Sequence, residues 1–244
     1  MRNHRAKALW PVPIVALLIA FIIISGCGGG SSGRQVLPGE NPLGVSTTDT
    51  ATGTTTGTST STGTGTATAS PAQQISDGWV NMGYGNYSSA MVQFQAVIDR
   101  TDSTAAERIE AYNGLGWARA KAYGMTSGIS DFTQAGENSE AKLGLAFALI
   151  QQAQVSGIRR AVDLFENLGL GTPTAPLLIT HQAIGVTTAE AHAMLAYAYY
   201  SRGDTGDEAK AREQILAARS LDSSTTTSVA QIYNLLVKLG LTGI

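Results

Sequence analysis

The sequence predicts an all-α fold of stacked antiparallel helix pairs, and three observations support this class. From residue 72 onward the chain is rich in Ala and Leu. A four-residue pattern of leucine, small residue, aromatic residue and alanine occurs at Leu115–Ala118, Leu145–Ala148 and Leu195–Ala198, and internal repetition of this kind is typical of helical repeat proteins. The only cysteine is Cys27, so no disulfide framework supports the helical region and its fold must rest on packing.

The first 26 residues have the three parts of a secretory signal. A basic stretch, residues 2–7, precedes an apolar run, residues 8–24, and the small pair Ser25-Gly26 follows. Prolines 11 and 13 leave too few helical residues in the run to span a bilayer. A signal peptide that is cleaved after residue 26 is therefore favoured over an uncleaved membrane anchor.

The residues Ile24-Ser25-Gly26-Cys27 resemble the lipobox of bacterial lipoproteins. The resemblance implies cleavage before Cys27 and acylation of this cysteine by a diacylglyceryl group and a further chain such as palmitate. Two or more chains are enough for stable membrane anchoring. The alternative is a plain secretory signal followed by an incidental cysteine.

The same resemblance implies a place in the cell envelope. Gly28 follows the cysteine, whereas lipoproteins that Gram-negative cells retain on the inner membrane carry Asp there. Gly28 therefore implies the outer membrane, on its periplasmic or surface face, if the cell is Gram-negative. In a cell with a single membrane, the protein would stay outside the plasma membrane.

Residues 27–71 are predicted to be the lipid-anchored cysteine followed by a disordered linker. Residues 46–70 are almost entirely Thr, Gly, Ser and Ala, and such a tract has no large apolar side chains with which to offset its ordering entropy. A flexible chain of this length spans about 35 Å. The threonines leave two alternatives open, a plain spacer and an O-glycosylated stalk.

The helical region, residues 72–244, resembles the tetratricopeptide repeat (TPR). In its first unit, Gly78, Gly85, Tyr87 and Phe94 fall at the small, turn, aromatic and large positions of that family. The resemblance extends to about residue 222. It implies a solenoid of helix pairs in which the first helix of each pair lines a concave groove, and each copy of the four-residue pattern is expected to open such a helix.

Packing within the pairs follows from residue size. Small residues in the first helices let the second helices approach closely, and large aromatic residues fill the space between pairs. The small residues are Gly78, Gly116, Ala146 and Ala196, and the large ones are Phe94, Phe132 and Phe165.

Two stretches depart from a regular array. Residues 168–188 contain three glycines and two prolines, so they cannot be an uninterrupted helix. We expect a loop inserted between the third and fourth pairs and packed down by its aliphatic centre, Leu177–Ile179. Residues 225–239 carry apolar side chains at helical spacing and are predicted to form a helix that caps the solenoid.

Four aromatic residues occupy equivalent places in the first helices: Trp79, Trp117, Phe147 and Tyr197. One interpretation is a ladder that binds a peptide or helix of a partner in the groove, because Trp and Tyr are favoured at binding hot spots. The alternative is that they pack between repeats as core.

The sequence contains no pattern typical of an enzyme, a cofactor or a metal. His181 and His192 lack the spacing of metal ligands, and no nucleophile elbow occurs. Cleavage of the signal leaves 13 basic against 18 acidic residues, which argues against nucleic acid as a partner. We expect an envelope scaffold or assembly factor for an unidentified protein or peptide, in an oligomeric state that the sequence leaves open. The alternatives are a structural stalk protein and an accessory subunit of an envelope enzyme.

Overall fold

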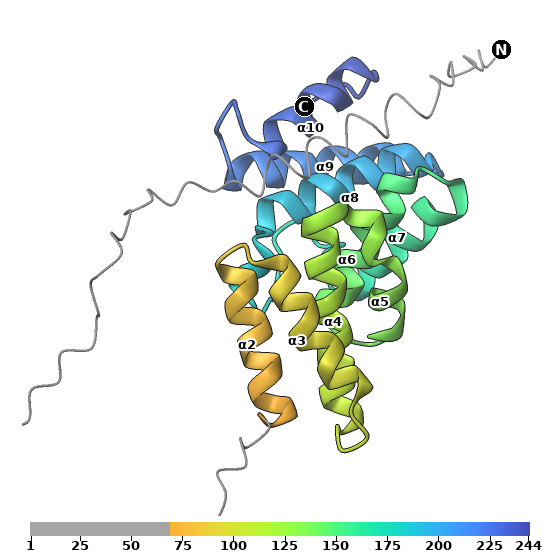
Figure 1. Ribbon diagram of the computed structural model, residues 1–244. Helices are drawn as coiled ribbons and strands as arrows, with labels where there is room; N and C mark the ends of the chain where they lie inside the picture. Colours follow the sequence, from red (N-terminus) through yellow and green to blue (C-terminus); the bar gives the residue numbers. More distant parts are fainter. Residues whose placement is uncertain (1–68) are drawn as a thin grey trace, which may run out of the picture. The chain divides into compact units, whose positions relative to one another are not determined.

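The computed structural model describes residues 69–244, and these residues form nine α-helices and no strand (Figure 1). The all-α prediction is confirmed for this part of the chain. The signal peptide, Cys27 and the linker lie outside the described residues. The helices are α2 (Pro71–Gly83), α3 (Tyr87–Asp99), α4 (Ala105–Tyr123), α5 (Ile129–Gln134), α6 (Ser139–Gln152), α7 (Val155–Asn167), α8 (Thr188–Arg202), α9 (Asp207–Leu221) and α10 (Ser228–Lys238), with short 3-10 helices η1 (Met125–Gly128) and η2 (Gln182–Ile184).

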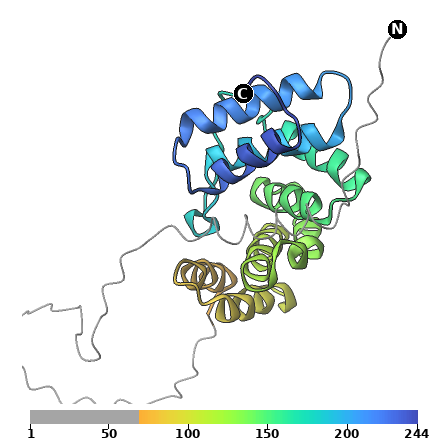
Figure 2. The ribbon, with the colours of Figure 1, turned by 90° about the horizontal axis from the view of Figure 1, so that it is seen from above.

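The helices pack mainly against their neighbours in the sequence. Figures 1 and 2 show the succession from α2 and α3 to α8 and α9, with α10 packed on α8 and α9. The first helices of successive pairs also touch, α2 against α4 and α4 against α6. Among the described residues, no helix combines the length and the apolar character that crossing a membrane requires.

Side-chain caps determine where the first helices begin. Thr104 and Glu107 form a capping box at the start of α4, Asn138 caps α6, and Thr187 and Glu190 form a capping box at the start of α8. The four-residue pattern therefore lies in the middle of each helix. The expectation that each copy opens a helix is wrong, because the caps precede the pattern by several residues.

Glycines in the first helices let aromatic rings approach the backbone, as the sequence predicts. A methyl group on Gly78 would lie 2.6 Å from the ring of Phe94, and one on Gly116 would lie 2.6 Å from the ring of Phe132. Both phenylalanines are buried, and so is Phe165. A larger residue would collide with the ring, so only glycine fits at these positions.

A C-terminal helix packs on the last pair, at the place where the sequence predicts a helix. α10 begins after its N-cap Thr227, a little later than the predicted start at residue 225. Its buried residues Val229, Ile232 and Leu236 face α8 and α9. They cover apolar surface that the last pair would otherwise expose.

Residues 171–187, here called the inserted segment, connect α7 to α8 and reach back to α2 (Figure 1, teal). From Pro173 to Ala183 its residues alternate between half-buried and exposed, which is the pattern of an extended chain lying on a surface. Leu177 and Ile179 face the helices, but Leu178 is 79% exposed. The prediction that the whole aliphatic centre packs down is therefore wrong for Leu178, because neighbouring side chains of an extended chain point in opposite directions.

Candidate functional site

The four aromatic residues of the predicted ladder are buried. Trp79 is 9%, Trp117 1%, Phe147 3% and Tyr197 6% exposed. The ring of Trp117 packs edge-on against Phe132 at 5.3 Å between centroids. These values favour the core alternative, because a partner would have to open the helical unit to reach the side chains.

Trp79 differs from the other three in what covers it. Its ring stacks on the imidazole of His181, with 3.8 Å between centroids and 6° between planes. Its Nε1 donates a hydrogen bond to Oε1 of Glu110 at 2.9 Å. The face of Trp79 is thus covered by the inserted segment rather than by a neighbouring helix pair.

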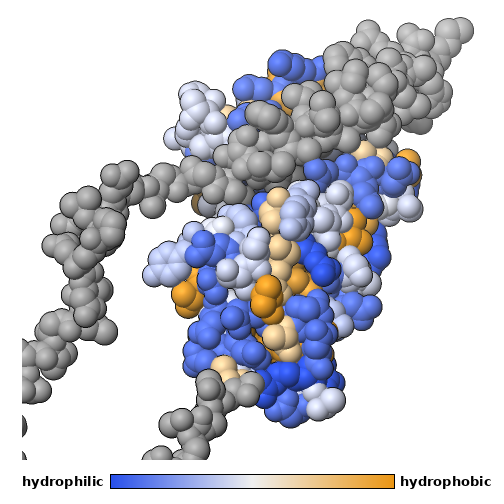
Figure 3. Space-filling model, viewed as in Figure 1, coloured by the Kyte–Doolittle hydropathy of each residue, from blue (hydrophilic) through white to orange (hydrophobic). Residues whose placement is uncertain are grey.

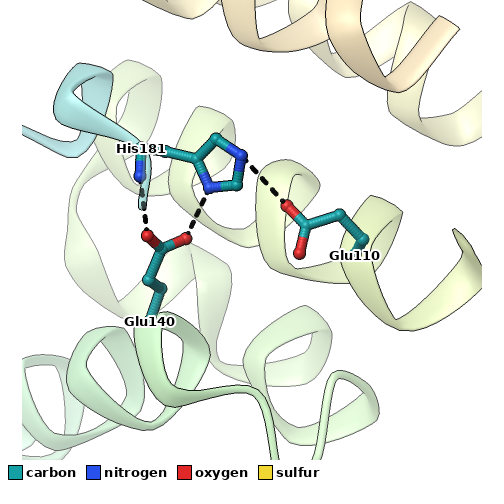
Figure 4. Close-up of side chains that lie close together, drawn as sticks. All are labelled: Glu110, Glu140 and His181. Carbon is teal, nitrogen blue, oxygen red and sulfur yellow. Dashed lines mark hydrogen bonds and ion pairs between the residues drawn. The ribbon is translucent and has the colours of Figure 1, made fainter. Parts of the chain in front are cut away.

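His181 lies between two carboxylates from different helices (Figure 4). Its Nδ1 is 2.7 Å from Oε2 of Glu140 on α6, and its Nε2 is 3.6 Å from Oε1 of Glu110 on α4. The other oxygen of Glu140 accepts the backbone N–H groups of Thr180 at 2.6 Å and His181 at 2.8 Å. One carboxylate therefore holds both the side chain and the backbone of the inserted segment.

Two asparagines position the carboxylates. The Nδ2 of Asn113, a fully buried residue, donates to Oε2 of Glu140 at 2.9 Å. The Nδ2 of Asn138 donates to Oε2 of Glu110 at 3.0 Å, and its Oδ1 caps α6 through the N–H groups of Glu140 and Ala141. The cap that starts α6 thus also places Glu110. We call Trp79, Glu110, Asn113 and Glu140 together the acidic site.

The surroundings shift the pKa values of all three titratable groups. Burial opposes ionisation of Glu140, but hydrogen bonds from His181 and Asn113 outweigh it and lower the pKa of Glu140 to about 2. Burial raises the pKa of Glu110, and His181 and Trp79 offset this only in part. Burial opposes the charge on His181, but the two carboxylates outweigh it and raise the pKa of His181 above 6.5. The arrangement favours an imidazolium between two carboxylates.

Glu110, Glu140 and His181 also have the residue types of a metal centre. One ligand atom from each lies within 4.8 Å of the others. However, all four carboxylate oxygens already accept hydrogen bonds from this chain, and Nδ1 of His181 is bonded to Glu140. These bonds account for the geometry, and we assign the cluster as an ion-pair network.

Other side chains hold the backbone of the inserted segment. Oγ1 of Thr188 accepts the N–H of Leu177 at 3.1 Å, and Nε2 of the buried His192 lies 2.9 Å from the carbonyl oxygen of Ala175. Gln214 donates to the carbonyl oxygen of Gly171, the first residue of the segment, at 2.9 Å and to that of the preceding Leu170 at 3.0 Å. The helices therefore bind the extended segment largely through its main chain.

The exposed hydrophobic side chains suggest no second site. On the face in Figure 3, hydrophobic residues form small separate patches among hydrophilic ones. Exposed large residues occur on several elements, for example Val80 on α2, Val92 on α3 and Val155 on α7. Scattered residues of this kind are normal for a protein surface.

We expect the stability of the helical unit to decrease as the pH rises above 6.5. Because the pKa of His181 is raised in the folded state, protonation of His181 stabilises the fold. This contribution is complete below pH 6.5 and is lost as the pH rises past the raised pKa. Urea unfolding of the wild type and of His181→Gln between about pH 5.5 and 8.5 measures it. The difference between the two proteins should narrow as the pH rises, and a constant difference would contradict the assignment.

Neither protein-family models nor curated proteins nor solved structures provide a match to this chain. The functional assignment therefore depends on the residues and their geometry alone.

Proposed function

We propose that this chain is a lipid-anchored envelope protein whose helical unit, a TPR-like array of helix pairs, binds an extended peptide segment of another protein. The supporting observation is the inserted segment itself. Side chains of α6, α8 and α9 bind its backbone N–H and carbonyl groups while its residues alternate between inward and outward positions. Recognition through the main chain suits extended peptides of varied sequence.

The anchor in this proposal is Cys27, and its test is chemical. Cells fed an alkyne-tagged fatty acid should incorporate the tag into the wild-type protein, and the protein should sediment with membranes. Cys27→Ser should lose both properties, because the chain has no other thiol to acylate. Equal labelling of the wild type and the variant would refute acylation at Cys27 and leave the plain secretory signal as the explanation.

Peptide binding is tested separately by crosslinking in cells. A photoreactive amino acid replaces Val80, which is 54% exposed and next to Trp79 on α2, or Val92, which is 67% exposed on α3. We expect position 80 to yield a defined crosslinked product that position 92 does not. Identical products at both positions, or none at position 80, would favour a structural stalk without a peptide ligand.

A further inference from the structure

The acidic site has the chemistry of a site for an organic cation. A carboxylate oxygen of Glu110 and one of Glu140 each lie near a nitrogen of the His181 imidazole, and the indole of Trp79 covers the face of that ring. Carboxylates bind cations by charge, and the face of an indole attracts them through its quadrupole. The chain itself supplies a histidine there, and a histidine carries its charge only below its pKa.

The part of the chain that carries His181 is bound as a surface layer. Leu170 and Ile184, on either side, are fully buried. Between them, no residue from Gly171 to Ala183 is fully buried. The middle of the segment can therefore leave the helices while the two buried ends stay in the core, and this exposes Trp79 and both carboxylates.

We propose that the acidic site is an interaction site for an arginine or lysine side chain of an extended partner peptide, which takes the place of His181. The inference rests on the proposed peptide-binding function and adds the chemical class of the partner. A guanidinium or ammonium group stays charged at pH values where imidazole is neutral. A basic partner side chain therefore gains over His181 as the pH rises, while the backbone contacts remain available to either chain.

The inserted segment supplies the probe for a test. A fluorescent peptide with the sequence of residues 173–184, PTAPLLITHQAI, is made in three forms: unchanged, with His181→Arg and with His181→Ala. The protein's own segment competes with the added peptide at a high effective concentration, because the two are parts of one chain. The full-length protein, solubilised in detergent, therefore carries His181→Ala to weaken this competition. A second protein variant, Ile179→Ser, loosens the segment without altering the acidic site, and circular dichroism verifies that both variants are folded.

At about pH 8 we expect the arginine peptide to bind on the order of tenfold more tightly than the alanine peptide, which corresponds to about 1.4 kcal/mol, since only the arginine can place a cation between the carboxylates and on the indole face. The affinity of the histidine peptide should approach that of the arginine peptide as the pH falls towards 6.5. Adding Glu110→Gln to His181→Ala should remove most of the preference for arginine, because the acidic site then loses one of its two charges.

The outcomes separate this inference from the proposed function. Equal binding of the arginine and alanine peptides would overturn the preference for a basic side chain and leave peptide binding intact. Failure of all three peptides to bind two folded variants would overturn both proposals. Dimerisation of the variants, seen by light scattering, would identify the segment of a second copy as the occupant and would also overturn the inference.

Discussion

Replacing Phe132 by Ala should lower the free energy of unfolding by about 3–5 kcal/mol and the melting temperature by roughly 10 °C. The ring of Phe132 is almost fully buried, and a methyl group on Gly116, Gly128 or Gly144 would lie within 2.4–2.7 Å of it. Because three of the positions around the ring are glycines, they offer no side chains to fill the cavity that alanine leaves. Thermal and urea unfolding followed by circular dichroism measure the loss.

The control for this prediction is Val92→Ala, a truncation on an exposed face of α3. We expect a change within about 0.5 kcal/mol, as for most surface substitutions. A loss of the same size for both variants would mean that the stability of this unit does not depend on the contact between glycines and aromatic rings.

That contact was readable from the sequence because its parts are local. Gly78 and Gly116 each precede a tryptophan on a helix with apolar neighbours, and a phenylalanine follows on the next helix. Residue size alone then selects which helix faces touch. The starts of the helices depend on equally local residues. The repeated pattern suggests that a helix starts at Leu115, whereas the capping box of Thr104 and Glu107 starts α4 at Ala105.

The sequence does not predict the acidic site with His181 because the residues come from four distant stretches. Trp79 is on α2, Glu110 and Asn113 are on α4, Glu140 is on α6, and His181 is in the inserted segment. One signal was available. A glutamate stands five positions before each copy of the four-residue pattern, at Glu110, Glu140 and Glu190, so equivalent helices that touch, such as α4 and α6, bring two of these carboxylates together.

Replacing Glu140 by Ala should lower the free energy of unfolding by about 3–5 kcal/mol, the usual cost of removing one partner of a buried ion pair. The substitution leaves the imidazolium of His181, the N–H of Thr180 and the amide of Asn113 without their acceptor. We also expect a protease such as thermolysin to cut the inserted segment at lower temperature than in the wild type. Urea unfolding and limited proteolysis measure the two effects.

Two control variants show whether the effect of Glu140→Ala comes from loss of the charge or from a general loss of helix stability. Glu137→Ala removes the acidic partner of Lys142, a carboxylate that is 94% exposed, and should change stability by less than about 1 kcal/mol. Glu140→Gln keeps an acceptor oxygen for the backbone and should give an intermediate loss. If Glu140→Ala behaves like Glu137→Ala, Glu140 does not hold the segment.

Cleavage within residues 173–183 while the helical signal persists would mean that the segment leaves the helices without unfolding them. This release is the step that binding of a partner peptide requires.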